Sequence, residues 1–225
     1  MCSHFVAFAR RAARVGAFGA MILLVGVAVA RAGDLTFDLR DPQGAPIADA
    51  VVSLVPLDAP AKITPPAEPL EILQSGQEFS TFVTPLVVGS TIVFQNADKV
   101  SHQIYSLSPP KKFALPLHKP GSAPTVVFDR PGVVALGCNI HDWMLAYVVV
   151  LETPWFAKSA RDGHATLSAP AGHYRAEIWH PRLAKTATRE LTVADGANAP
   201  QSFTLALKPE RRIPRRIESG AGGYK

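Results

Sequence analysis

Two apolar runs, separated by only seven residues, constrain the fold of this chain more than any other stretch of its 225 residues. The runs are Val-Val-Ala-Leu-Gly at 133–137 and Leu-Ala-Tyr-Val-Val-Val-Leu at 145–151. Each has the length and composition of a strand, and neither is long enough to favour a helix. We therefore interpret the seven residues between them, 138–144, as a tight loop that joins two strands.

Three metal-binding side chains fall within this loop: Cys138, His141 and Met144. They offer a thiolate, an imidazole and a thioether, and this set suits copper in both oxidation states better than other common biological metals. A mononuclear copper site that transfers electrons uses one thiolate, two imidazoles and a weak axial thioether. The loop therefore predicts a copper site that needs one more imidazole from elsewhere in the chain.

His102 is the candidate for the second imidazole. It follows a polar turn at 96–99 and precedes a predicted strand at 103–107. The rival is His118, which lies in a connection rich in proline and lysine and is expected to be solvated. The later histidines are expected at ordinary surface or edge positions: His164, His173 and His180.

Simpler interpretations of the same residues stay open. Cys138 could be an ordinary buried thiol, Met144 could be core filler, and His102 could be a solvent-facing turn histidine. Trp143 is either a core aromatic residue or part of an apolar rim around an exposed edge of His141.

The N-terminal residues 1–32 are typical of a signal peptide. Three arginines precede an uncharged stretch that is too short for a membrane span, and cleavage is expected after Ala32, or after Ala30 as an alternative. Removing residues 1–32 would take away four arginines and no acidic residue, and so lower the formal net charge from +5 to +1. The basic tail 208–225, expected to be disordered, holds six basic and two acidic residues, which leaves the body near −3. The body is therefore not a basic nucleic-acid binder.

If the chain is exported and residues 1–32 are removed, the presence of Cys138 calls for an explanation. Beyond residue 32, Cys138 is the one cysteine and Met144 the one methionine in the sequence. An intrachain disulfide is then impossible, and a bare thiol in an oxidising compartment needs another reason to be there.

The remaining sequence favours an all-β chain of sandwich domains, because it is rich in Val, Pro, Gly and Thr and has no long helical periodicity. Regularly spaced turn residues predict a β-sandwich over 71–151. Two strands within 34–57 and four short strands within 152–207 are each too few to bury a core. We therefore expect them to join into one discontinuous module, connected to the first sandwich through a proline-rich linker at 58–70.

The Cys-x-x-His-x-x-Met loop together with His102 resembles the cupredoxins, the blue-copper family, and its spacing is that of the short-loop type found in amicyanin. The resemblance implies a Greek-key sandwich that holds one type 1 copper ion. Two residues depart from the family pattern: Gln103 stands where relatives have an Asn that ties two loops together, and Asp142 stands where they often have Pro. The discontinuous module resembles Ig-like modules of the carboxypeptidase regulatory type, and the whole chain resembles secreted bacterial proteins labelled methylamine-utilisation or plastocyanin-like.

These observations predict a periplasmic type 1 copper protein of a Gram-negative-type bacterium, which exchanges electrons with another exported redox protein such as a cytochrome or dehydrogenase. It is expected to be a monomer without a stable membrane span. The alternatives are a copper-delivery protein and a surface interaction module. An enzyme is not expected, because four ligands leave no open position on the metal for a substrate.

Overall fold

The computed structural model describes residue 1 and residues 32–210. The predicted signal peptide (except Met1 and Ala32) and residues 211–225 of the predicted tail lie outside these described residues. Within 32–210 the chain forms strands, turns and loops and no helix. None of the described residues therefore belongs to a helix that could span a membrane. The all-β sandwich prediction is confirmed.

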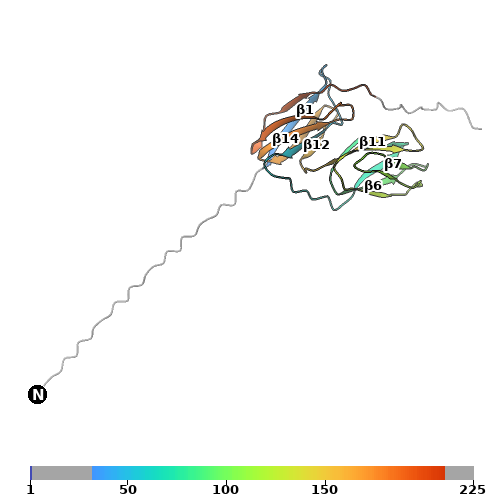
Figure 1. Ribbon diagram of the computed structural model, residues 1–225, viewed down its shortest axis with the longest axis horizontal. Coiled ribbons are helices and arrows are strands. Elements are labelled where there is room, and N and C mark those ends of the chain that lie inside the picture. Colours follow the sequence, from blue (N-terminus) through green and yellow to red (C-terminus); the bar gives the residue numbers. More distant parts are fainter. Residues whose placement is uncertain (2–31, 211–225) are drawn as a thin grey trace, which may run out of the picture.

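Within residues 32–210 there are four sheets, and two of them contain the first and last strands of this range, which Figure 1 draws in blue and orange side by side. One sheet has the order β13-β1-β16, with β17 also paired to β1, and the other has the order β12-β2-β14-β15. The strands of the first sheet are β1 (Ala32–Arg40), β13 (His164–Pro170), β16 (Gly196–Ala197) and β17 (Gln201–Thr204). Those of the second are β2 (Val51–Pro56), β12 (Phe156–Lys158), β14 (Gly172–Trp179) and β15 (Ala187–Val193).

The other two sheets come from the middle of the chain, which runs from turquoise through green to yellow in Figure 1. One has the order β4-β3-β6-β9, with β3 (Leu70–Ser75), β4 (Glu78–Phe79), β6 (Ser90–Asn96) and β9 (Thr125–Phe128). The other has the order β5-β11-β10-β7-β8, with β5 (Val83–Val87), β7 (Ile104–Ser106), β8 (Phe113–Ala114), β10 (Gly132–Cys138) and β11 (Leu145–Leu151).

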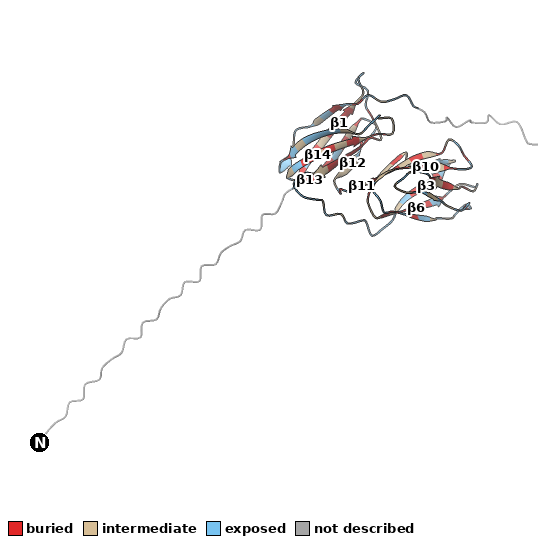
Figure 2. Cartoon of the chain, viewed as in Figure 1, coloured by how far each residue is buried: buried red, intermediate tan, exposed pale blue. Residues whose placement is uncertain are grey.

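Alternating burial along the strands gives each pair of sheets its own core, because successive side chains of a strand point to opposite faces. In β6, Ile92 and Phe94 are buried and alternate with more exposed residues, and Val134 and Leu136 of β10 are buried in the same cluster. The pair of sheets that contains β1 has a separate core cluster, in which Phe37 is fully buried. Figure 2 shows the buried positions along the strands of both parts.

The two parts meet through the outer faces of two sheets. Val51 of β2 and Val149 of β11 are buried in one small apolar cluster. Beside it, the rings of Tyr147 and Trp179 pack edge to face with their centroids 5.6 Å apart. Because Tyr147 and Val149 lie on β11, this contact also holds the strand that follows the 138–144 loop.

Sequence periodicity does not reveal β5, β8, β12 or β16. β5 contains Pro85, and proline is rare in strands because it has no N–H to donate. β5 lies at the edge of its sheet, where the missing N–H is tolerated. The other three strands are two or three residues long and are too short to show a period of two. Tertiary pairing, rather than local pattern, makes these segments strands.

Candidate metal centre

The predicted loop between two strands is present. β10 ends at Cys138, β11 begins at Leu145, and the last residue pair of this antiparallel ladder joins Gly137 to Leu145. Inside the loop, the Met144 N–H donates to the carbonyl of His141 at 3.0 Å. The loop is therefore a closed turn fixed at both ends by sheet hydrogen bonds.

A second segment delivers His102 to the same place. Cys138 is paired in register with Ile104 of β7, so His102 arrives two residues before the strand that lies beside the cysteine. The main chain of His102 also forms an isolated antiparallel bridge with that of His118. Two separate loops therefore converge at this end of the sandwich.

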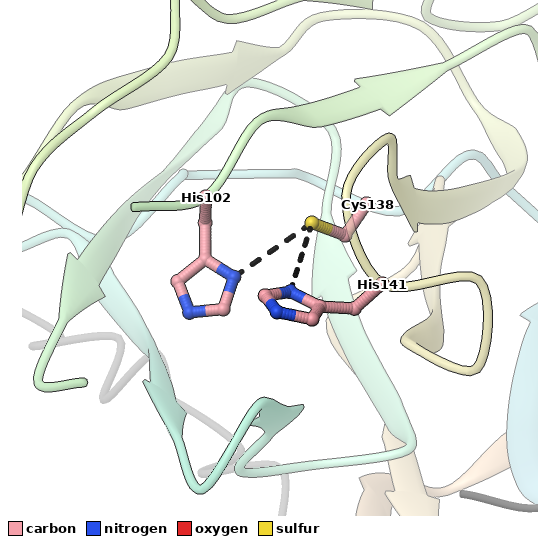
Figure 3. A group of neighbouring side chains, drawn as sticks. All are labelled: His102, Cys138 and His141. Atoms are coloured by element: carbon pink, nitrogen blue, oxygen red, sulfur yellow. Dashed lines mark hydrogen bonds between the residues drawn. The ribbon is translucent and has the colours of Figure 1, made fainter. Parts of the chain in front are cut away.

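The structure brings the side chains of His102, Cys138 and His141 together (Figure 3). The Nδ1 atoms of both imidazoles lie 3.7 Å from Cys138 Sγ, and all three ligand atoms lie within 4.8 Å of one another. The three residues are 0%, 3% and 8% exposed. This is a compact set of three metal-binding atoms shielded from water.

These separations fit a single metal ion. Zinc sites show bonds of about 2.3 Å to sulfur and about 2.0 Å to imidazole nitrogen, and with these lengths an angle of about 120° at the ion separates the two donors by about 3.7 Å. Both measured sulfur-to-nitrogen distances have this value. The distances suit copper and zinc alike, and it is the chemistry of the donors that distinguishes the two ions.

Met144, the predicted axial ligand, lies in the same loop with its side chain buried. It directly precedes β11, and its N–H is bonded within the loop. Its role as fourth ligand stays a prediction.

Asp98 orients the imidazole of His102, a role that the sequence did not reveal. Its Oδ2 lies 2.8 Å from His102 Nε2, so the ionised carboxylate accepts the Nε2 proton and leaves the Nδ1 lone pair facing Cys138. Partial burial raises the pKa of Asp98, but hydrogen bonds from the N–H of Gln77, from His102 and from the N–H of Gly76 outweigh it, and the net effect lowers that pKa. The acid therefore stays charged and fixes the His102 tautomer. The spacing of four between Asp98 and His102 was visible, but in a turn that spacing alone predicts no contact.

The expectation for His118 was wrong. Its side chain is 7% exposed, because the segment around it folds back against His102 instead of extending into solvent. Its Nε2 lies 2.7 Å from Gln74 Oε1, and burial lowers its pKa. Proline and lysine in the sequence around it indicated a solvated connection, but the backbone pairing with His102 could not be read from composition.

The expectation of surface or edge positions holds for two of the three later histidines and is wrong for the third. His173 is exposed and His164 partly exposed, as expected, whereas His180 is buried directly after β14. Burial and the nearby Arg182 lower the pKa of His180 to about 4. All three lie in the part of the chain that does not contain His102, Cys138 and His141.

The two departures from the family pattern have different outcomes. Gln103 does tie the loops together: its Oε1 accepts a hydrogen bond of 3.1 Å from Asn139 Nδ2, and its carbonyl accepts one of 3.0 Å from the Asn139 N–H. Asp142 is exposed within the loop. A glutamine thus makes the link expected of an asparagine.

Trp143 lies against His141 rather than in the core. Its ring centroid is 5.3 Å from that of His141, the residue is partly exposed, and its Nε1–H donates to the Gln77 carbonyl at 2.9 Å. The neighbouring Ile140 is exposed. Apolar side chains therefore flank His141 at the surface.

The Asp98→Asn protein is expected to bind metal about 10- to 100-fold more weakly, the usual cost of removing a carboxylate that orients a ligand histidine. A competition titration with a chelator measures this. The matched control is Asp129→Asn, because Asp129 is an exposed acid paired with Lys111 away from the site. An affinity equal to that of the wild type would mean that Asp98 does not orient His102.

No protein-family model and no curated protein matches the chain. Among solved structures it is similar to a Cu-containing nitrite reductase from Thermus scotoductus SA-01, with 25% identity, a TM-score of 0.36 and 43% of this chain covered. This likeness spans only 25% of the nitrite reductase chain. A purple cupredoxin from Nitrosopumilus maritimus gives 26% identity, a TM-score of 0.33 and coverage of 36% of this chain and 99% of its own.

A reduced mutant of amicyanin gives 20% identity, a TM-score of 0.35 and coverage of 44% of this chain and 98% of its own. Each likeness is confined to less than half of this chain. Because every one of these TM-scores lies below 0.5, we interpret the metal centre from its own geometry.

Proposed function

We propose that this chain is an exported copper protein that carries electrons, with His102, Cys138, His141 and Met144 holding one type 1 copper ion. The observation that carries the proposal is the buried trio of one thiol and two imidazole nitrogens at 3.7 Å from the sulfur. One thiolate and two imidazoles with a nearby thioether is the donor set of electron-transfer copper sites, whereas structural zinc sites more often use two or more cysteines.

When bound, copper would supply the one-electron chemistry of the Cu(I)/Cu(II) couple. The residues of the chain supply the geometry. Asp98 holds the His102 ring with Nδ1 toward Cys138, and sheet pairing on both sides fixes the Cys138 loop. Because the donors already stand at metal-binding separations, little rearrangement is needed to bind the ion or to change its charge.

Four protein donors leave no open position for a substrate, so we propose a carrier rather than an enzyme. The periplasm as location rests on the signal-peptide features of residues 1–32. The partner we propose is another exported redox protein, a cytochrome or dehydrogenase, met as a transient complex by a monomer.

Electron exchange would take place at the surface beside His141. This is the least buried of the three donors, and Trp143 and Ile140 give its surroundings the apolar character that small transient redox interfaces use. The other two donors are covered more completely by the sandwich.

The Ile140→Lys protein is expected to exchange electrons with itself about tenfold more slowly, because two new cations would face each other in the encounter complex. NMR line broadening in mixtures of oxidised and reduced protein measures this rate. The matched control is Val127→Lys: Val127 is 47% exposed against 48% for Ile140, and it pairs with Thr91, well along β6 from the end that leads to His102. Equal slowing in both variants would place the exchange surface elsewhere.

The proposed function is tested by adding one equivalent of Cu(II) to the purified chain and then reducing and reoxidising it. We expect an intense visible band that disappears on reduction and returns on oxidation, with the copper retained throughout. Loss of copper in either state would favour the delivery alternative. Preferential and tight binding of zinc, with a colourless copper form, would contradict the redox assignment.

A further inference from the structure

His102 belongs to a hydrogen-bonded cluster of polar side chains within a mostly apolar sandwich. Asp98, which is partly buried, contacts His102 directly, and the cluster continues through three buried residues, Gln74, Asn96 and His118. Buried polar groups cost free energy unless they are hydrogen-bonded, so a cluster of them beside one ligand needs a physical reason.

The first link in this cluster is through the main chain. The His102 N–H donates to the His118 carbonyl at 3.1 Å, and the His118 N–H donates to the His102 carbonyl at 2.9 Å. Asn96 Nδ2 donates to the same His118 carbonyl at 3.3 Å and to the Val100 carbonyl at 2.9 Å. The backbone of His102 is thus fixed to that of His118 rather than to a long strand.

The second link is through side chains. His118 Nε2 lies 2.7 Å from Oε1 of Gln74, which stands at the end of β3, in register with Asn96 of β6. The Gln74 amide nitrogen is buried and has no hydrogen-bond partner among the described residues. The buried amide therefore makes one strong contact, and that contact is to His118.

We propose that Gln74 and His118 are positioning residues: their side-chain hydrogen bond fixes the 116–120 segment to β3 and thereby holds His102 in place for the metal. The imidazole of His118 does not belong to the cluster of donor atoms formed by His102, Cys138 and His141: its Nε2 lies against Gln74 Oε1 and its Nδ1 lies 3.4 Å from the Pro116 carbonyl. The expected effect on copper affinity rests on the proposed function, whereas the expected effect on the backbone of His102 does not.

Hydrogen exchange of the metal-free chain tests the backbone part. In His118→Leu and Gln74→Leu, protection of the His102 and His118 amides is expected to fall by about tenfold, the effect of losing one buried hydrogen bond. His118→Gln, whose amide can still reach Gln74, should keep most of the protection, and so should the control His173→Gln, because His173 is exposed in the other part of the chain. If the Leu variants do not fold, His118→Asn, which is too short to reach Gln74, replaces them.

Copper affinity of the same variants, measured by chelator competition, tests the positioning part. We expect about tenfold weaker binding when the Gln74–His118 bond is lost and near-normal binding in His118→Gln. Unchanged amide protection in the Leu variants would overturn the proposal, and so would lost protection with unchanged affinity, since the pair would then be structural only. If the wild type binds no copper, the proposed function fails, and the exchange data alone decide whether the pair holds His102.

Discussion

The Cys138→Ser protein is expected to lose the intense visible absorption of the copper form and to bind copper more than about 100-fold more weakly than the wild type. The thiol is the one sulfur donor of the buried trio, and a hydroxyl is a poor ligand for Cu(I). The loss should exceed the roughly 10- to 100-fold cost of changing an orienting residue such as Asp98. Optical spectra and a chelator competition on the two proteins measure both effects.

Serine at this position should leave the fold intact, because Cys138 is a buried free thiol and serine is of similar size. Thermal unfolding of both metal-free proteins provides that control. If the Ser variant kept the colour and the affinity, Cys138 would not be a ligand, and the convergence of two imidazoles on its sulfur would have only a packing role.

The Phe94→Ala protein is expected to lose about 3–5 kcal/mol of unfolding free energy, a large share of the stability of a domain. Phe94 is fully buried in the core cluster of the sandwich that contains the site, and its ring lies 6.4 Å from that of Phe113. Urea unfolding followed by circular dichroism measures the loss. Because β6 also leads into the His102 loop, copper affinity should fall as well.

The matched variant is Phe37→Ala, which empties a fully buried position in the other core cluster. It should cost a similar free energy but leave copper affinity unchanged, because no residue of the site lies in that core. If the two cores unfold independently, each variant shifts a separate transition. A loss of affinity in Phe37→Ala equal to that in Phe94→Ala would contradict this separation.

Much of the site could be predicted because it depends on local sequence. Two apolar runs of strand length set a seven-residue loop between them, and register in the ladder then brings both ends of that loop together. The alternation in β6 and β10 similarly follows from a period of two. His102 lies beside the loop because a polar turn before a strand brings a side chain to the end of a sandwich, and that turn is visible in the sequence.

The rest depends on contacts between distant segments. Asp98 contacts His102 and His118 contacts Gln74 only once the chain is folded. Nothing in the local sequence of His118 distinguishes it from a solvated histidine. β5 was missed for the same reason, since it is a strand through its parallel pairing with β11 and not through its own pattern. Buried positions are usually apolar, so a sequence pattern assigns polar residues to the surface. Polar residues that are buried because they support a ligand side chain are therefore missed.

The most direct test of the central claim is X-ray absorption spectroscopy of the copper-loaded chain. Four donors around one ion predict a shell of one short sulfur and two imidazole nitrogens, with a second, more distant sulfur from the thioether. A shell of nitrogen and oxygen alone would mean that copper binds somewhere other than between His102, Cys138 and His141, and would contradict the assignment.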